Sequence, residues 1–313
     1  MRREDLPFTR LKEVPIDIQR DGLTWAWVSE WIRIYARWGF NVEPKYDGED
    51  ELLVRTRDGQ VYLINRYGTV YTDKDLPWLS QVRAGFPFIL RGELHLPGGR
   101  SFDIKPTLRA DPMKLKLVLH DCINWNGVDL RNTSFERRRR HIGEFQLENI
   151  FPIESRPAAP EEVEQLYHEA VERGYEGIII KPLTATYTDE AFLKIKKEVT
   201  LDVILLHAKD TEQFRETGIP WSFTMHTHIQ GKLTYIGDVS SGLKPEERME
   251  LKQLITPEAT RIGGEKYYRL SRPIVAEVSC QEILQTEGQT RLRHPKILRL
   301  RHDKPPEQCH LSG

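Results

Sequence analysis

The chain has 313 residues, a formal net charge of −1 and an ordinary hydrophobic content. This length predicts two domains and is sufficient to bury two cores. The near-neutral charge excludes a global attraction to nucleic acid, so a polyanion site would need a local concentration of cations. The three cysteines, Cys122, Cys280 and Cys309, form no C-x-x-C pair. Their spacing argues against structural zinc and against a disulfide framework, and it fits a reducing cytosol.

The sequence shows no targeting or membrane segment. The N-terminal stretch MRREDLPFTRLKEVP is charged and lacks the apolar region of a signal peptide. No apolar run approaches the length that a membrane-spanning helix requires. We therefore expect a cytoplasmic protein without membrane contact, associated with the nucleoid if the source is prokaryotic.

The first predicted element is an amphipathic helix over LTWAWVSEWIRIYARWGF, which ends near Gly39. Its large apolar side chains recur at spacings of three and four, which predicts that they pack in a core. These side chains are Trp27, Trp31, Ile34, Tyr35 and Trp38. Short β-like runs follow. They are a hairpin, ELLVRTRDGQVYLINRYGTVYT, which turns at Asp58-Gly59, and the strands FPFILRGELHLPGG and KLKLVLHDCI.

The segment PEEVEQLYHEAVERGYEG predicts a second helix, because acids occupy its first turn and Gly174 lies near its end. The strands GIIIKP and FLKIKK come next. From about residue 200 the sequence changes to short alternating strands with one helical stretch at residues 246–255. This pattern predicts an α+β antiparallel-sheet domain over residues 1–199 and an OB-fold β-barrel over residues 200–313.

Several charged side chains interrupt apolar runs, where a solvated face explains them least well. Glu93 follows FILRG, Glu176 precedes GIII, and Lys181 closes that run. Lys194 and Lys196 alternate with apolar residues, so both lie on one strand face. Each of these residues alone is compatible with a strand end or a wet surface. Together, however, the lysines can bind phosphate oxygens, and the two carboxylates can bind a divalent metal and a ribose.

Lys45 lies in the segment NVEPKYDGEDELLV, residues 41–54. By itself, Asp47-Gly48 is an ordinary hairpin-turn signal, which favours a solvated charge in a turn. A nucleophilic lysine is the alternative, and this segment alone does not decide between the two. A lysine attacks a phosphate only when it is neutral, and neighbouring cations and desolvation lower a lysine pKa. We expect Lys181, Lys194 and Lys196 to supply those cations.

In this order and spacing the motifs resemble the covalent nucleotidyltransferase superfamily, specifically the ATP-dependent DNA ligases. KYDG (45–48) resembles motif I, LRGEL (90–94) motif III, EGIIIK (176–181) motif IV and KIK (194–196) motif V. NRYG (65–68) resembles the Arg-x-Gly element, and residues 117–140 resemble motif IIIa. TYIGDVSSGL (234–243) resembles a ligase strand-turn, and RHPKILRLRHDKPP (293–306) resembles motif VI.

The resemblance implies an enzyme that joins nicked double-stranded DNA as a monomer, with ATP and Mg²⁺ (or Mn²⁺) as cofactors. Lys45 would accept AMP, with Lys181, Lys194 and Lys196 assisting. AMP would then pass to a 5′-phosphate, and a 3′-hydroxyl would displace it. By resemblance, the nucleotide site comprises Glu43, Lys45, Arg66, Glu93, His120, Lys181, Lys194 and Lys196; Glu176 and Glu93 would bind the metal; and Arg301, Asp303 and Lys304 would orient pyrophosphate.

Two positions depart from the family pattern. Asp50 stands where the family usually has arginine, and Arg66 or Arg55 could supply the missing donor. His120 stands where an aromatic side chain usually stacks on adenine. An RNA ligase, a GTP-using capping enzyme and a degenerate, non-catalytic nucleic-acid-binding relative remain alternative interpretations.

The sequence offers further candidate sites of a weaker kind. The basic run from Arg291 to Lys304 and the arginines at 137–140 are candidates for phosphate contacts with DNA, although four adjacent arginines on a helix cannot share one face. His226 and His228 share a strand face, but without a third ligand nearby a structural role is favoured over a metal site. Cys122 is expected to be buried.

Overall fold

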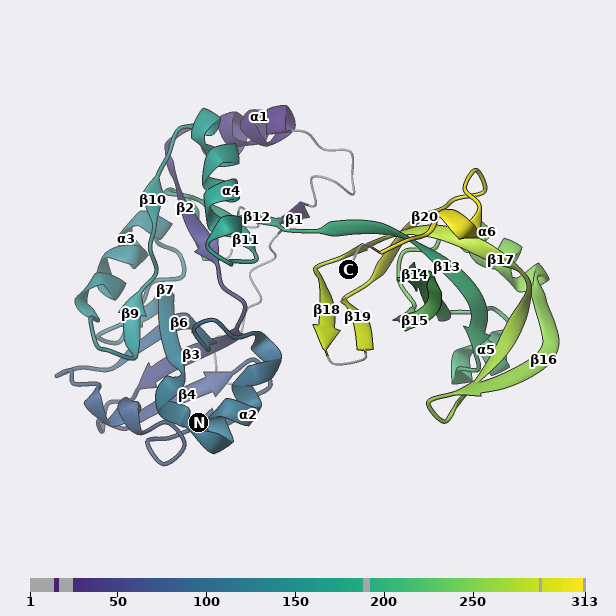
Figure 1. Ribbon diagram of the computed structural model, residues 1–313. Coiled ribbons are helices and arrows are strands. Elements are labelled where there is room, and N and C mark those ends of the chain that lie inside the picture. Colours follow the sequence, from purple (N-terminus) through teal and green to yellow (C-terminus); the bar gives the residue numbers. More distant parts are fainter. Residues whose placement is uncertain (1–13, 17–24, 188–191, 287–288, 312–313) are drawn as a thin grey trace. The chain divides into compact units, whose positions relative to one another are not determined.

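The computed structural model describes residues 14–16, 25–187, 192–286 and 289–311 (Figure 1). The chain divides into two compact units, Met1–Lys196 and Lys197–Gly313. The first unit contains helices and two main sheets, and the second is built mostly of antiparallel strands. Among the described residues, no helix is both long and apolar enough to cross a membrane.

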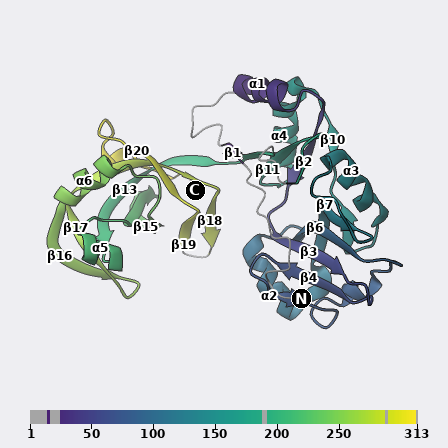
Figure 2. The ribbon, with the colours of Figure 1, turned by 180° about the vertical axis from the view of Figure 1, so that it is seen from behind.

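One sheet of the first unit has the strand order β1-β12-β11-β2-β10. Its strands are β1 (Val14–Ile16), β12 (Leu193–Lys196), β11 (Gly177–Pro182), β2 (Phe40–Lys45) and β10 (Arg156–Pro157). Helices α1 (Trp25–Tyr35) and α4 (Val163–Glu172) pack on one face of this sheet (Figures 1 and 2). Alternation along the strands turns Ile178, Ile180, Leu193 and Ile195 towards these helices. The charged side chains between them therefore point to the opposite face.

Both predicted helices form, but α1 buries different side chains from those expected. Val28 and Ile32 are 1% exposed, whereas Tyr35 is 60% and Trp38 70% exposed. Helical spacing defines two apolar faces here, and the smaller, β-branched face is the one that meets the sheet. The prediction that the aromatic face is core is wrong for Ile34, Tyr35 and Trp38, which are exposed. Trp27 is 37% exposed, while Trp31 packs partly against the cluster.

The other sheet of the first unit has the order β5-β4-β3-β6-β7-β8, with β9 paired to β7. Its strands are β3 (Glu49–Arg55), β4 (Val61–Asn65), β5 (Val70–Tyr71), β6 (Phe88–His95), β7 (Lys116–Trp125), β8 (Val128–Asp129) and β9 (Ile150–Pro152). The predicted hairpin joins β3 to β4, and Gly59 adopts a φ of +89° at its turn. Short helix α2 (Ile104–Ala110), which was not predicted, packs Ile104 into the core of this sheet, and α3 (Phe135–Arg140), which carries the four adjacent arginines, packs against β7.

The two sheets enclose an apolar cluster between them. Leu52, Val54 and Ile64 from the second sheet meet Ile179 from the first, together with Phe135, Tyr187 and Phe192. The reverse face of the second sheet carries a larger core around Leu53, Leu63, Phe88 and Leu117. Polar side chains that point into the space between the sheets consequently lie next to an apolar, water-poor region.

The second unit curls six strands around one core. They are β13 (Val199–Lys209), β14 (Phe223–Ile229), β15 (Lys232–Val239), β16 (Ile255–Ile262), β17 (Glu265–Cys280) and β20 (Lys296–Leu300), with α5 (Glu212–Thr217), α6 (Pro245–Gln253) and a hairpin of β18 (Glu282–Thr286) and β19 (Gln289–Arg293). The long β16–β17 hairpin and the β18–β19 hairpin were not predicted as such. Gly242 has a φ of +103°, and a Cβ there would lie 1.9 Å from the Ile297 carbonyl oxygen. Only glycine therefore fits the predicted strand-turn at this point.

Candidate active site

The polar face of the first sheet gathers most of the lysines that the sequence singled out. Lys45 on β2 lies opposite Gly177 of β11, which in turn lies opposite Lys196 of β12. One pair further along, Glu43 lies opposite Ile179, which faces Lys194. Residues directly opposite in an antiparallel pair point to the same face, so these charged side chains share one surface.

The KYDG segment links the two sheets. Lys45 ends β2 in the first sheet, and Glu49 begins β3 in the second, so Asp47-Gly48 is a crossover and does not connect paired strands. A Cβ on Gly48 would lie 2.6 Å from Glu93 Cγ and 2.4 Å from the Leu94 carbonyl oxygen. The interpretation of Asp47-Gly48 as a hairpin turn is therefore wrong, and the glycine lets Glu93 pack against the segment that carries Lys45.

Lys45 makes an ion pair with Glu176. The Glu176 backbone N–H also donates to the Lys45 carbonyl oxygen at 2.9 Å, which fixes the start of β11 beside the end of β2. Both side chains are largely shielded from solvent, at 14% and 16% exposure. The expected surrounding of Lys45 by cations is thus incomplete, because an acid is its direct partner.

Lys181 is buried and holds Glu43. Its Nζ lies 2.7 Å from Glu43 Oε2 and donates to the His120 carbonyl oxygen at 3.2 Å. Arg139 Nε lies 3.8 Å from Glu43 Oε1. Sequence reasoning did not single out Arg139 as part of this site, because it lies in a run of four arginines with nothing to distinguish it from its neighbours.

The second sheet contributes acids and a histidine to the same space. Asp50 on β3 lies opposite Glu93 on β6. Ligand atoms of Asp50, Glu93 and His120 all lie within 4.8 Å of one another. The two carboxylates and the imidazole form a donor set that could hold a divalent cation. Glu176, the other predicted ligand, interacts electrostatically with Glu93.

Burial changes the protonation behaviour of these groups. It raises the pKa of Glu93 to about 8, with Asp50 and Glu176 adding to the increase and Lys45 opposing it. Burial, with help from Lys196, lowers the pKa of Lys194 to about 8. Burial and the charges of Lys181 and Arg91 lower the pKa of His120, whose Nδ1 is buried without a hydrogen-bond partner. A neutral imidazole suits stacking on a base or binding a cation.

The two arginines considered as replacements at position 50 lie elsewhere. Arg66 is exposed and donates to the Tyr67 hydroxyl at 2.6 Å. Arg55 donates to the Phe86 carbonyl oxygen at 3.1 Å. Arg55 is also at the far end of β3, about 17 Å from Asp50 along an extended strand. The structure therefore does not bring Arg66 into contact with the other predicted nucleotide-binding residues that it describes.

In the second unit, the three residues assigned to motif VI lie together just after β20. Arg301 donates from Nε and Nη2 to Asp303 at 2.9 and 2.8 Å. Lys304 Nζ donates to Asp202 Oδ2 at 2.6 Å, and Arg301 Nη1 lies 3.5 Å from Asp202 Oδ1. Asp202 on β13 is therefore their common partner, which no sequence signal indicated.

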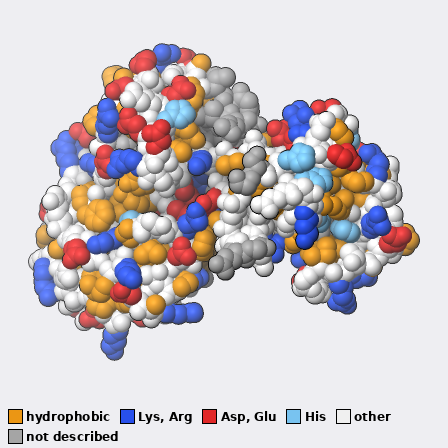
Figure 3. Space-filling view, viewed as in Figure 1, with side chains coloured by type: hydrophobic (Ala, Val, Ile, Leu, Met, Phe, Trp, Pro, Cys, Tyr) orange, Lys and Arg blue, Asp and Glu red, His pale blue; other side chains and the backbone are white. Residues whose placement is uncertain are grey.

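The arginines at 137–140 lie in different environments. Arg138 is fully buried and forms a bidentate pair with Asp121, at 2.7 and 3.1 Å. Contact of Arg138 with DNA is therefore ruled out. Arg140 is exposed and pairs with Glu136. On the face shown in Figure 3, basic and acidic side chains are interspersed over each unit, in keeping with the net charge.

The histidines of β14 belong to two separate neighbourhoods. His226 lies near His207, with ring centroids 6.1 Å apart, whereas His228 lies near His310 at 5.4 Å. Among the described residues, no group of three ligands includes either of them. Cys122 is buried, as predicted.

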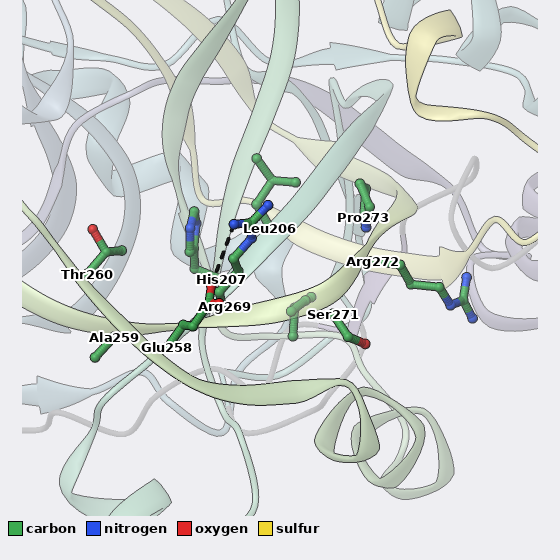
Figure 4. A pocket seen from close by; sticks show the side chains of 10 residues that line it. Leu206, His207, Glu258, Ala259, Thr260, Arg269, Ser271, Arg272 and Pro273 are labelled. Atoms are coloured by element: carbon green, nitrogen blue, oxygen red, sulfur yellow. Dashed lines mark ion pairs between the residues drawn. The ribbon is translucent and has the colours of Figure 1, made fainter.

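A pocket of about 350 Å³ lies within the second unit, between β13 and the β16–β17 hairpin (Figure 4). His207, Arg269 and Arg272 line it, and Arg269 pairs with Glu258 at 3.5 Å. None of the residues predicted for nucleotide or metal binding lines this pocket.

Comparisons with known proteins agree with the motif pattern. The family described as "ATP dependent DNA ligase domain" matches residues 26–196, and "ATP dependent DNA ligase C terminal region" matches residues 219–304. A DNA ligase of Thermococcus fumicolans is 30% identical over 225 residues, covering 67% of this chain and 39% of the relative. A DNA ligase of Methanoculleus marisnigri is 27% identical over 311 residues, covering 95% and 53%. The chain thus spans about half the length of these curated relatives.

Two solved structures support the fold. "Pmar-Lig_PreS3" has a TM-score of 0.67 at 18% identity and covers 92% of this chain and 67% of its own. A structure titled "DNA binding with a minimal scaffold: Structure-function analysis of Lig E DNA ligases" has a TM-score of 0.60 at 15% identity, covering 85% and 93%. These likenesses confirm the predicted α+β domain followed by an OB-fold-like region.

Proposed function

Because the chain belongs to the family of ATP-dependent DNA ligases, we propose that it seals nicks in double-stranded DNA, beginning with transfer of AMP from ATP to Lys45. The observation that supports this assignment is the placement of Lys45. Lys45 ends β2 at the crossover to the second sheet and lies on the same face as Lys194 and Lys196. It pairs with Glu176 and interacts electrostatically with Glu93. A solvated turn lysine has no need of this environment.

The proposed chemistry has three steps. Lys45 Nζ attacks the α-phosphorus of ATP: an N–P bond forms, the bond to the pyrophosphate oxygen breaks, and the amine releases a proton. The AMP group then moves from Lys45 to the 5′-phosphate at a nick, which restores the lysine. Finally, the adjacent 3′-hydroxyl attacks that phosphate, AMP leaves, and a phosphodiester bond forms. In this scheme Arg301, Asp303 and Lys304 orient the departing pyrophosphate.

The remaining residues bind and orient the nucleotide. Glu43 reads the adenine amino group, His120 stacks on the base, and Lys181 and Lys194 bind phosphate oxygens. Glu43, His120 and Lys181 are linked, because Lys181 contacts both the Glu43 carboxylate and the His120 backbone carbonyl. Movement of one of these groups would therefore displace the others.

Glu93 and Glu176 are the proposed ligands of a divalent cation, Mg²⁺ or Mn²⁺, with Asp50 and His120 within reach of Glu93. The donor set fits such an ion, because burial and neighbouring carboxylates raise the pKa of Glu93 to about 8 and an added positive charge would relieve this repulsion. When bound, the ion would neutralise negative charge on the triphosphate.

Labelling of Lys45 tests the proposal. Wild type incubated with α-labelled ATP and Mg²⁺ should acquire an acid-labile label, and Lys45→Ala should acquire none. Lys74→Ala is the matched control, since Lys74 is an exposed lysine of the same unit, and it should label as wild type does. Equal labelling of Lys45→Ala and wild type would contradict the assignment.

Substrate assays separate the alternatives. We propose that the enzyme is a monomer that joins nicked DNA with ATP. Preferential sealing of nicked RNA would favour an RNA ligase, and labelling by GTP would favour a capping-type enzyme. A chain that binds nucleic acid but never labels would be a non-catalytic relative. Size-exclusion chromatography with light scattering would show whether the active species is one chain.

A further inference from the structure

Arg91 and Asp50 form a bidentate ion pair in the candidate active site. Arg91 Nε lies 2.7 Å from Asp50 Oδ1, and Arg91 Nη2 lies 2.7 Å from Asp50 Oδ2. The side chains are 12% and 30% exposed. Two parallel charge-assisted hydrogen bonds fix the guanidinium plane, and Asp50 is still accessible enough to meet a ligand.

Arg91 brings a guanidinium into contact with the residue at the position where the family pattern has arginine, although from a different strand. Asp50 of β3 occupies the position at which the family usually has arginine, and its partner comes from β6. Arg91 precedes Glu93 by two residues on that strand, so both side chains point to the same face of the sheet. The positive group missing from β3 is thus supplied by the neighbouring strand.

The chemistry of the pair indicates what it can bind. The two charges cancel, and the pair keeps both a donor edge, on Arg91, and acceptor lone pairs, on Asp50. A sugar diol matches this combination, because a hydroxyl can accept from the guanidinium and donate to the carboxylate. A phosphate matches it poorly, because its charge would meet the Asp50 carboxylate as well.

The position of the pair fits a sugar. Asp50 Oδ1 lies 3.9 Å from His120 Nε2, the side chain proposed to stack on the base. On its other side Asp50 lies opposite Glu93, which interacts electrostatically with Lys45. In a nucleotide the sugar lies between the base and the phosphates, and the pair lies between the groups assigned to each.

We propose that Arg91, held in place by Asp50, contacts the ribose hydroxyls of the bound nucleotide and makes the site selective for a ribonucleotide. The inference rests on the proposed function for the identity of the nucleotide. Tyr187 completes the arrangement, with its hydroxyl 3.4 Å from Arg91 Nη1 and its ring centroid 5.9 Å from the guanidinium carbon.

Binding experiments without turnover test this inference separately from the proposed function. In a Lys45→Ala background, ATP and 2′,3′-dideoxy-ATP are titrated calorimetrically against the parent and an added Arg91→Gln substitution. The parent should prefer ATP. Arg91→Gln should weaken ATP binding by about 10- to 100-fold and change dideoxy-ATP binding by no more than about twofold, the range expected for loss of a charged hydrogen bond. Equal weakening of both nucleotides, or of neither, would overturn the proposal.

Two further variants guard against a merely structural effect. Arg131→Gln is the matched control, because Arg131 forms a similar bidentate pair with Asp129 at the surface of the same unit, through Nε to Oδ1 and Nη2 to Oδ2. It should leave the preference for ATP unchanged. The double exchange Asp50→Arg with Arg91→Asp rebuilds the pair in reverse and should recover at least part of the preference. An exchange variant that melts like the parent but shows no preference would refute the role of the pair. Failure of wild type to form lysyl-AMP would refute only the proposed function.

Discussion

Glu51 is a buried acid of the second sheet, and its protonation should make the stability of the first unit depend on pH. It lies on β3 between Asp50 and Leu52, with its side chain turned to the core face, and it is 0% exposed. Neither carboxyl oxygen has a hydrogen-bond partner. Burial, reinforced by Glu49, Asp50 and Glu93, raises its pKa from 4.5 to about 10. In the folded protein the group is therefore a neutral carboxylic acid at ordinary pH.

The sign of its effect on stability follows from proton binding. Above pH 4.5 the unfolded chain releases this proton, while the folded chain keeps it up to about pH 10. Because the folded state binds more protons, its stability falls as the pH rises through this window. Each pH unit corresponds to about 1.4 kcal/mol. Between pH 5.5 and 7.5 the loss is therefore about 2 to 3 kcal/mol from this single group.

Glu51→Gln should remove that loss, because the amide has no proton to release. Urea unfolding at pH 5.5, 6.5 and 7.5 is followed by tryptophan fluorescence, which reports mainly on the first unit because Trp221 is the only tryptophan of the second. The free-energy difference between Glu51→Gln and wild type should grow with pH. The exposed Glu172→Gln is the control and should show no such trend. A difference that is independent of pH would refute the reasoning.

Three further outcomes are expected. Arg138→Met should destabilise the first unit by about 3 to 5 kcal/mol, because it leaves the buried Asp121 carboxylate unpaired, whereas the exposed neighbour Arg137→Met should change thermal stability little. Gly242→Ala should destabilise the second unit by more than about 3 kcal/mol, because its Cβ would clash with a facing backbone carbonyl, whereas Gly231→Ala, with φ of +76° but open space, should cost about 1 kcal/mol in a melting experiment. Binding of nicked DNA should weaken by at least about tenfold between 50 and 200 mM salt in a fluorescence-anisotropy titration, and insensitivity to salt would contradict binding through phosphate contacts.

Local pattern was sufficient to predict most elements of the fold. Short β-like runs predicted β6, β7, β11 and β12. Acids in the first turn and a closing glycine predicted α4, because such signals depend only on residues that are neighbours in the sequence. The same information could not say which apolar face of α1 meets the sheet, since both faces have helical spacing. Packing against the sheet decides that question, and it selects Val28 and Ile32.

The candidate site divides in the same way. Lys194 and Lys196 share a face because strand alternation requires it, and this could be predicted from the sequence. The pairing of β2, β11 and β12 brings Lys45 and Glu43 to the same face, which the order of the motifs suggested but local pattern could not show. Arg139 was missed because its neighbours in the sequence are also arginines. Its role depends on which of them faces Glu43 after folding, and helical spacing alone does not say which face of α3 meets the site.

The Asp50–Arg91 pair shows most clearly what single positions conceal. At position 50 the acid is a departure that suggests a weakened site, and Arg91 lies in the segment that resembles motif III but received no role from the sequence. Pairing of β3 with β6 puts the two side chains in contact, so the charge absent from one strand is present on the other. The chemistry of an active site depends on where a charge lies after folding and not on which strand carries it. An apparent loss at one motif position is therefore evidence of impaired function only after the cross-strand neighbours of that position are known.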